Sequence, residues 1–522
     1  MIPGHLSSGS TKISDPPPQA PPERQHLPPP LPPPPPLPPP PPPSLSLSLS
    51  QPQVYRAAAN AGEMAGPLAR PGNASDDRIN ELPEVLLSDI LSRLGTAEAA
   101  RTVVLSTRFR DAWLATPLRL DDLELPVPAR GKVPSIQPWT ARADVVTRAL
   151  ASHPGPVALF RLSRTSFRGR VDAAEAWFRQ LAAKHAREVS LFFSPEWCHD
   201  ALADPLLGCP TLQVLALGKC HLSDAGASAV AAAALTELTL SETCISEAAL
   251  QSVLSGCPAL RSLVLKHVNG LQRIRVCSCR SLVLLGVWHY KQVDEITVED
   301  APCLERLLGN MRLNAAITVT GAPKLTAFGY AVVSIPHLFH GERAPQGVSK
   351  GLRAPIHSVK ILAITVKFSS KKDMEKVMSL LECFPCLETL HFQSSDTDYR
   401  SGADEDYTTV SDYIQQRYPI RCVARHLKSV RLECKHHNPG MLEFACFLLA
   451  RAHVLQFMRI QSKMCGVPKW VTSQQNLLSQ SNMASLEAEV VFEGMKRLKD
   501  FTIEGVDALS DPFDGEINIL EH

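Results

Sequence analysis

The sequence has few aromatic residues and almost no net charge. Phenylalanine, tyrosine and tryptophan make up 6% of the 522 residues, and 53 basic side chains balance 52 acidic ones. A protein that binds nucleic acid through its phosphates carries a basic surplus, so this balance argues against a nucleic-acid-binding protein. Hydrophobic residues still account for 44% of the chain, and we therefore expect a large core built from aliphatic side chains.

Long apolar runs are also missing. No stretch approaches the roughly 18 consecutive apolar residues that a membrane-spanning helix needs, and no basic segment leads into an apolar one at the start of the sequence, as it would in a secretory signal. We therefore expect no membrane association and a location in the nucleus, the cytoplasm or both. In such compartments the 14 cysteines are expected to be reduced.

Proline, by contrast, is abundant and unevenly placed. The chain has 45 prolines, with unbroken runs at residues 32–36 and 38–43. Because proline fixes φ and lacks an amide donor, we expect residues 1–75 to form a disordered, proline-rich tail. A ligand for SH3-, WW- or profilin-like grooves and a tail without a specific partner both fit this composition, and translation could also begin at Met64.

A small helical module is predicted at residues 76–120. Apolar residues recur every four positions through its first half, as Leu82, Leu86, Ile90 and Leu94, and Leu87 and Leu91 widen this stripe. Pro83 suits a first helical turn and Gly95 a helix end. Thr96, and either Ser106 or Thr107, are expected to cap a second and a third helix. Three short helices cannot close a core alone, so part of this apolar surface is expected to meet a partner.

This module resembles the F-box of plant F-box proteins. The matching residues are Leu82-Pro83, residues 90–94, Thr96-Ala97-Glu98-Ala99, residues 101–106, Arg108-Phe109-Arg110 and Trp113. Gly95 replaces the usual proline, and Phe109 replaces the commoner tryptophan. The resemblance implies docking onto a Skp-family adaptor, and through it onto the cullin and RING subunits of a ubiquitin ligase. The residues it places at the adaptor are Leu82, Pro83, Leu86, Ile90, Leu94, Val104 and Leu105. Several of them could instead only hold the three helices together.

From Val157 onward one short pattern returns, with aliphatic residues at spacings of three and two. Clear copies are Leu212-x-x-Leu215-x-Leu217, Leu235-x-x-Leu238-x-Leu240 and Leu260-x-x-Leu263-x-Leu265, and successive copies from Leu212 to Leu325 begin 21 to 25 residues apart. This period is typical of leucine-rich repeats, in which each unit adds one strand to a curved parallel sheet. We therefore predict an α/β fold, in which a three-helix F-box precedes a leucine-rich-repeat solenoid at residues 150–415 with ten or so units. Loops are expected at residues 336–355 and 394–407, and the first lies in a gap from Leu325 to Leu387 that interrupts the repeat period.

The C-terminal part, residues 416–510, is similar to the FBD region that follows the repeats in plant F-box proteins. The matching residues are 426–432 and 441–452. The second group predicts a helix that begins after Asn438-Pro439-Gly440, and we expect this region to close the solenoid. As a whole the chain thus resembles a plant F-box/LRR-repeat protein with a C-terminal FBD-like region.

No catalytic motif or complete metal-ligand set is apparent. The candidate zinc ligands are Cys383 and Cys386, Cys277 and Cys279, and Cys434 with His436 and His437. Structural zinc needs four well-placed ligands, and neither cysteine pair has a convincing second half. We therefore expect no catalytic residue, no metal and no cofactor.

The concave face of the solenoid is the predicted binding surface for an unidentified target protein. Its outward positions that suit protein recognition are Lys266, Trp288, Arg306, His391 and Arg431, although Trp288 could instead pack beneath a neighbouring loop. The function that these features favour is a non-catalytic substrate receptor of a ubiquitin ligase. One alternative is a scaffold outside any ligase that uses the repeats and the proline-rich tail. The other, an enzyme, has only the Cys-x-x-Cys pair behind it.

Overall fold

The computed structural model describes residues 79, 82–125, 138–165, 170–191, 202–288, 293–312, 315–333, 354–395, 420–435, 437–495 and 510–513. The chain divides into residues 1–75 and residues 76–522, and every described residue belongs to the second unit. The predicted proline-rich tail, Met64 and His436 lie outside the described residues. So do most of the two predicted loops.

The predicted helical module is present as α1 (Glu84–Arg93), α2 (Thr96–Thr102) and α3 (Thr107–Ala115). Ser106 is the residue that caps α3, because its Oγ accepts a hydrogen bond from the Phe109 amide at 3.2 Å. The predicted cap at Thr96 is wrong, since Thr96 is already the first residue of α2. A side chain distant in sequence does the capping instead: the Glu124 carboxylate accepts from the Thr96 amide at 3.2 Å.

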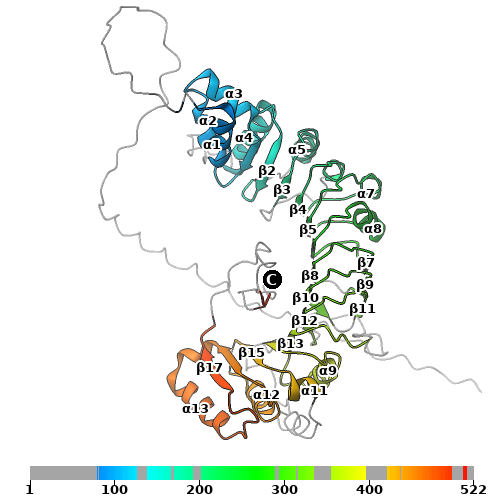
Figure 1. The fold of residues 1–522 in the computed structure, drawn as a ribbon, viewed down its shortest axis with the longest axis vertical. Coiled ribbons are helices and arrows are strands. Elements are labelled where there is room, and N and C mark those ends of the chain that lie inside the picture. The colour runs from blue at the N-terminus through cyan, green and yellow to red at the C-terminus, as the bar shows by residue number, and fades with distance from the viewer. Residues whose placement is uncertain are drawn as a thin grey trace, which may run out of the picture. The chain divides into compact units, whose positions relative to one another are not determined.

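In the described part of the chain, fourteen parallel strands form one sheet that follows the sequence order (Figure 1). The strands are β1 (Leu118–Asp121), β2 (Val157–Leu162), β3 (Glu188–Leu191), β4 (Val214–Gly218), β5 (Glu237–Ser241), β6 (Ser262–Lys266), β8 (Leu284–Trp288), β10 (Arg306–Arg312), β12 (Ala327–Val332), β13 (Ile361–Val366), β14 (Thr389–Ser394), β15 (Ser429–Cys434), β16 (Phe457–Ser462) and β17 (Glu489–Glu493). The repeat positions align from strand to strand: Leu215 pairs with Leu238, which pairs with Leu263. The predicted α/β fold with a parallel repeat sheet is confirmed.

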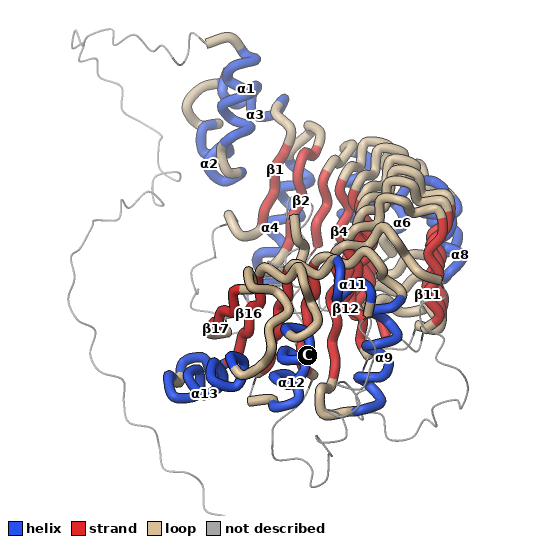
Figure 2. The backbone as a smooth tube through the Cα atoms, turned by 60° about the horizontal axis from the view of Figure 1, so that its bottom comes forward, coloured by secondary structure: helices blue, strands red, loops and turns tan. Residues whose placement is uncertain are grey.

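Helices and short strands connect the main strands on one face of this sheet (Figure 1). The helices are α4 (Pro138–Ser152), α5 (Val171–Ala183), α6 (Asp204–Leu207), α7 (Asp224–Ser228), α8 (Glu247–Gly256), α9 (Lys371–Glu382), α11 (Arg421–Arg425), α12 (Pro439–Leu449) and α13 (Pro468–Ser479), with a 3₁₀ turn at Lys463–Gly466. Between α8 and α9 the connections include a second, three-stranded parallel sheet made of β7 (Arg273–Cys277), β9 (Glu295–Glu299) and β11 (Ala316–Thr320) (Figure 2). In these strands inward aliphatic residues such as Ile274 and Val276 are fully buried, so a strand covers the core where the other units use a helix.

One continuous core runs between the main sheet and these connections. The aliphatic residues of each repeat pattern supply it; Leu212, Leu215 and Leu217, for example, are fully buried. The same pattern occurs in the stretch where an interruption was expected, because Val359, Leu362 and Ile364 are also fully buried around β13. The expected interruption between Leu325 and Leu387 is therefore wrong in part, since a complete unit with β13 and α9 lies there.

The helix predicted after Asn438 is confirmed as α12. The Asn438 Oδ1 accepts a hydrogen bond from the Met441 amide at 3.1 Å and so caps its first turn. The next stretch, which shows little pattern in the sequence, contains α13. Among the described residues no helix has both the length and the apolar character needed to cross a membrane.

His153, just after α4, joins the helical module to the sheet. Its Nε2 donates to the Trp113 carbonyl at 3.2 Å, and the two rings meet edge to face with centroids 5.1 Å apart. The Nδ1 atom is buried and hydrogen-bonds to no described residue. Burial lowers the pKa of His153 below its usual 6.5; the Trp113 carbonyl opposes this, and the charge of Lys184 adds to the lowering.

This environment makes stability dependent on pH. A histidine with a lowered folded-state pKa is protonated first in the unfolded chain, so the free energy of unfolding should fall as pH drops below about 6.5, until the folded-state pKa is passed. We expect His153→Gln to flatten this dependence in denaturant titrations from about pH 8 to about pH 5. The exposed His357 supplies the matched control, and an equal flattening in His357→Gln would contradict the assignment to His153.

Gly95 already has a backbone conformation that suits proline, the residue usual at this position in the resembling family. Its φ is −60°, and the preceding Leu94 is extended with ψ at 151°, as a residue before proline prefers to be. We expect Gly95→Pro to stabilise the chain by about 0.4–1 kcal/mol, because it restricts the unfolded state. Thermal or denaturant unfolding would measure the gain.

Gly95→Ala is the control for this prediction. A Cβ at position 95 would meet Glu124 Oε2 at 2.7 Å, and both variants introduce that atom, whereas only proline restricts φ. A proline variant no more stable than the alanine variant would contradict the expected entropic gain, because both variants displace the Glu124 cap equally.

Candidate protein-interaction surfaces

The helical module exposes part of the apolar stripe that recurs every four residues along α1. Leu87 and Leu91 face inward and pack with Phe109. Leu86 and Ile90 are 47% and 44% exposed on the outer side of α1. The four-residue spacing therefore marks a surface of α1 as well as its core, and the module leaves large apolar side chains in solvent.

A second pair of exposed apolar residues lies in the turn between α2 and α3. Val104 is 86% exposed and Leu105 is 67% exposed, although the Leu105 amide is held by the Thr102 carbonyl at 2.9 Å. The backbone of this turn is thus ordered while its side chains point outward. Apolar side chains of this size on an ordered turn are typical of a protein-interaction site.

The remaining residues predicted at the adaptor divide into two kinds. Pro83 is exposed just before α1. Leu82 and Leu94 are half-buried against the module's core, and the Leu82 carbonyl accepts a hydrogen bond from the Arg108 guanidinium. Leu82 and Leu94 therefore support the three helices whatever else they contact. The assignment of all seven residues to an adaptor stays a prediction.

On the other face of the main sheet, several outward residues form a second apolar cluster, here called the concave cluster. Its members are Val264, Leu284, Trp288, Leu308, Ala327, Tyr330, Ala363 and Phe513. Trp288 lies over Gly286, where an added Cβ would come within 2.4 Å of the indole ring. The indole is therefore buried, which fits the alternative that Trp288 packs under neighbouring structure. Its role in target binding stays a prediction, as do those of the exposed Lys266 and the half-buried Arg306.

His391 and Arg431, also predicted for the target, both contact residues 511–513, here called the return segment. His391 Nε2 lies 2.8 Å from Asp511 Oδ2, and Arg431 Nη1 donates to the Phe513 carbonyl at 2.6 Å. The structure thus brings two of the five predicted target-binding residues together. The return segment and Tyr330 were missed, because the contact from His391 to Asp511 spans 120 residues and no local pattern signals it.

The described cysteines are free thiols, and burial raises the pKa of several of them. The pKa of Cys220 rises to about 12, and the pKa values of Cys257, Cys279 and Cys422 rise to about 11. These thiols are protonated at neutral pH and are weak nucleophiles. Within the described ranges no three His, Cys, Asp or Glu side chains gather closely enough to hold a metal ion.

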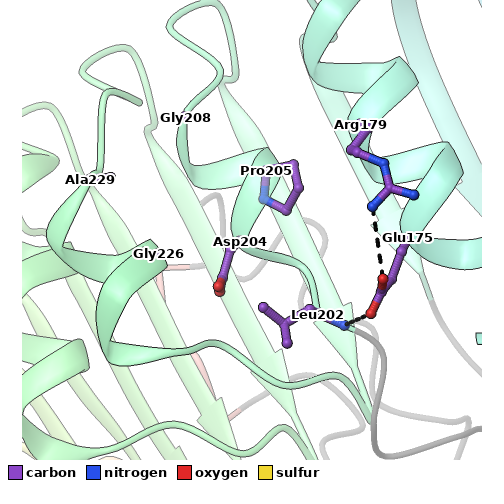
Figure 3. Close-up of a pocket in the computed structure, with 8 residues that line it drawn as sticks. All are labelled: Glu175, Arg179, Leu202, Asp204, Pro205, Gly208, Gly226 and Ala229. Atoms are coloured by element: carbon purple, nitrogen blue, oxygen red, sulfur yellow. Dashed lines mark hydrogen bonds and ion pairs between the residues drawn. The ribbon is translucent and has the colours of Figure 1, made fainter. Parts of the chain in front are cut away.

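A pocket of about 470 Å³ opens on the helical side of the sheet, between α5 and α7 (Figure 3). Its acidic groups are already bonded to the protein itself. Glu175 accepts from the Leu202 amide at 3.2 Å and lies 3.8 Å from Arg179, and Asp204 accepts from the Ser223 amide at 2.8 Å. These carboxylates hold adjacent units together.

Comparison with known proteins agrees with this architecture. Residues 174–392 match the family model described as FBD-associated F-box protein At5g56370, LRR repeats. The chain is 24% identical over 408 residues to F-box/FBD/LRR-repeat protein At1g13570 of Arabidopsis thaliana, which covers 75% of this chain and 92% of that protein. It is also 24% identical over 397 residues to FBD-associated F-box protein At3g52670 of the same plant, which covers 74% and 88%.

The chain is similar to the plant F-box/LRR-repeat proteins. A third match supports this: putative F-box/LRR-repeat protein At3g58880 of Arabidopsis thaliana is 31% identical over 216 residues, or 40% of this chain and 47% of that protein. The resemblance of the sequence to plant F-box/LRR-repeat proteins with an FBD region is thereby confirmed. In the present chain, the two apolar surfaces described above lie on the helical module and on the concave face of the repeat sheet.

Proposed function

We propose that the chain is the substrate-recognition subunit of a Skp–cullin–F-box ubiquitin ligase. The observation that carries this proposal is the exposed apolar surface of the helical module. Leu86, Ile90, Val104 and Leu105 stand in solvent on ordered backbone. Full burial of a Val or Leu side chain contributes about 1.5–3 kcal/mol, so covering these residues with a Skp-family adaptor would give a stable complex.

In this proposal residues 76–120 are the F-box, residues 150–415 the repeat solenoid and residues 416–510 the FBD-like closing region. The repeats bind a protein target, and the adaptor links the chain to cullin and RING subunits. The chain supplies no reacting group. It contributes proximity, because a target held on the repeats meets the ubiquitin-charged enzyme at a raised effective concentration.

Adaptor binding should depend on the exposed turn. We expect the double variant Val104→Asp/Leu105→Asp to lose about 2 kcal/mol or more of adaptor affinity, which is about 30-fold, because two apolar contacts are replaced by charges. Both side chains are more than half exposed, so the variant should unfold at the same temperature as the wild type. Pull-down or calorimetry with a purified Skp-family adaptor measures the loss.

Leu477 on α13 gives a matched control, because it is 52% exposed and lies outside the helical module. Leu477→Asp should bind the adaptor as the wild type does. Leu82→Ala/Pro83→Ala tests the other end of the surface and should also abolish the pull-down while the repeat region stays folded. Undiminished adaptor binding by both double variants would reject the ubiquitin-ligase assignment and favour a scaffold outside the ligase.

A further inference from the structure

The return segment (residues 511–513) is seated on the concave face of the repeat sheet. It comes from beyond β17 and contacts strands β12, β14 and β15. Phe513 is 2% exposed, and its ring meets Tyr330 edge to face with centroids 5.2 Å apart. On another side the Phe513 ring lies against His391, with centroids 5.7 Å apart. The concave face therefore holds a short peptide with its aromatic side chain enclosed.

The contacts of this segment are those of a recognition motif. One Asp511 carboxylate oxygen contacts His391 at 2.8 Å. The other accepts from the Phe513 amide at 2.9 Å, which is the local turn that an aspartate makes with the residue two positions on. Pro512, between them, fixes its own φ. An aspartate, a residue of restricted backbone and a phenylalanine thus form one preorganised unit.

The protein groups around the segment match this unit. Arg431 binds the Phe513 carbonyl and thereby the peptide backbone. Burial opposes ionisation of Asp511, but the hydrogen bond and charge of His391, together with the Phe513 amide and Arg431, hold the pKa of Asp511 below its usual range. The site therefore holds an anionic carboxylate two residues before an enclosed aromatic ring.

The return segment does not complete the main core. Phe513 belongs to the concave cluster, whereas the aliphatic repeat positions pack on the opposite face of the sheet, in the main core. Removal of the segment would leave that core intact and would uncover Tyr330 and its apolar neighbours. An apolar face that folding of the repeats does not require is available to a partner.

We propose that the site formed by Tyr330, His391 and Arg431 is the target-recognition site, and that it takes a protein segment carrying an aspartate two residues before a phenylalanine. The chain's own return segment occupies this site, and a target displaces it with a like segment. This inference rests on the proposed role of the repeats in binding a target. It adds the chemical class of the target segment and an intramolecular competitor.

The test uses the full chain with its own segment disabled, as Asp511→Ala/Phe513→Ala, here called the opened variant. The probe is a fluorescein-labelled peptide of residues 509–515, Leu-Ser-Asp-Pro-Phe-Asp-Gly, and its binding is followed by fluorescence anisotropy. We expect the opened variant to bind the probe at least about tenfold more tightly than the wild type, because a tethered competitor acts at an effective concentration of about 1 mM. The same peptide with alanine in place of its phenylalanine should not bind.

Arg431→Gln in the opened variant should abolish probe binding. Arg459→Gln is the matched control, because Arg459 pairs with Arg431 on the neighbouring strand but contacts Glu493 at 3.4 Å. It should leave probe binding unchanged. Unfolding temperatures of all variants show that each chain is folded.

Absence of binding to a folded opened variant at about 1 mM probe would overturn the inference, because the tethered segment would not stay bound at such an affinity. Equal losses in Arg431→Gln and Arg459→Gln would overturn it too. Adaptor pull-down on the same proteins separates the two proposals. Retained adaptor without probe binding rejects this inference alone, and probe binding without adaptor rejects the ligase assignment alone.

Discussion

The structure depends on the parallel ladder, because no repeat unit can bury its own aliphatic residues. Leu215 and Leu217 of one unit are fully buried only because Leu238 and Leu240 stack beside them. Each unit therefore needs neighbours on both sides, and the first unit needs a different kind of neighbour. The helical module contributes at that end: the Glu124 carboxylate, just beyond β1, binds the amide of Thr96, and Trp113 packs on His153.

The same constraint explains how much of the fold the sequence could predict. Features set by residues close together in the sequence were predictable: the spacing of Leu212, Leu215 and Leu217, the helix after Asn438, and a cap of α3 at either Ser106 or Thr107. The unit around β13 was predictable in principle, since Val359, Leu362 and Ile364 keep the repeat spacing. The sheet of β7, β9 and β11 was harder to predict from the sequence. In a short connection, a buried strand and a buried helical turn produce similar patterns of apolar residues.

The candidate sites were predictable to different degrees. The resemblance of residues 76–120 to an F-box singled out Leu86, Ile90, Val104 and Leu105, and all four are exposed. Periodicity alone could not decide whether Leu86 and Ile90 lie in the core or on the surface, because a stripe at a spacing of four fits either face of a helix. His391 and Arg431 could be placed on the concave face by strand alternation. Their partners Asp511 and Phe513 could not, because that pairing depends on how the chain returns across the sheet.

The helical module and the concave face both carry apolar side chains that their own helices and strands do not cover. On the helical module these side chains stay exposed, whereas on the concave face the return segment covers them. Val104 and Leu105 stay in solvent, which is tolerable on a small turn and keeps the surface available to a separate protein. The concave cluster contains more apolar side chains than the turn, and a larger apolar patch left uncovered favours nonspecific association. A cover tethered to the same chain prevents this while remaining displaceable, since its polar contacts are with His391 and Arg431 at the edge of the cluster. A ligand that reproduces those contacts can replace the cover without disturbing the repeat core.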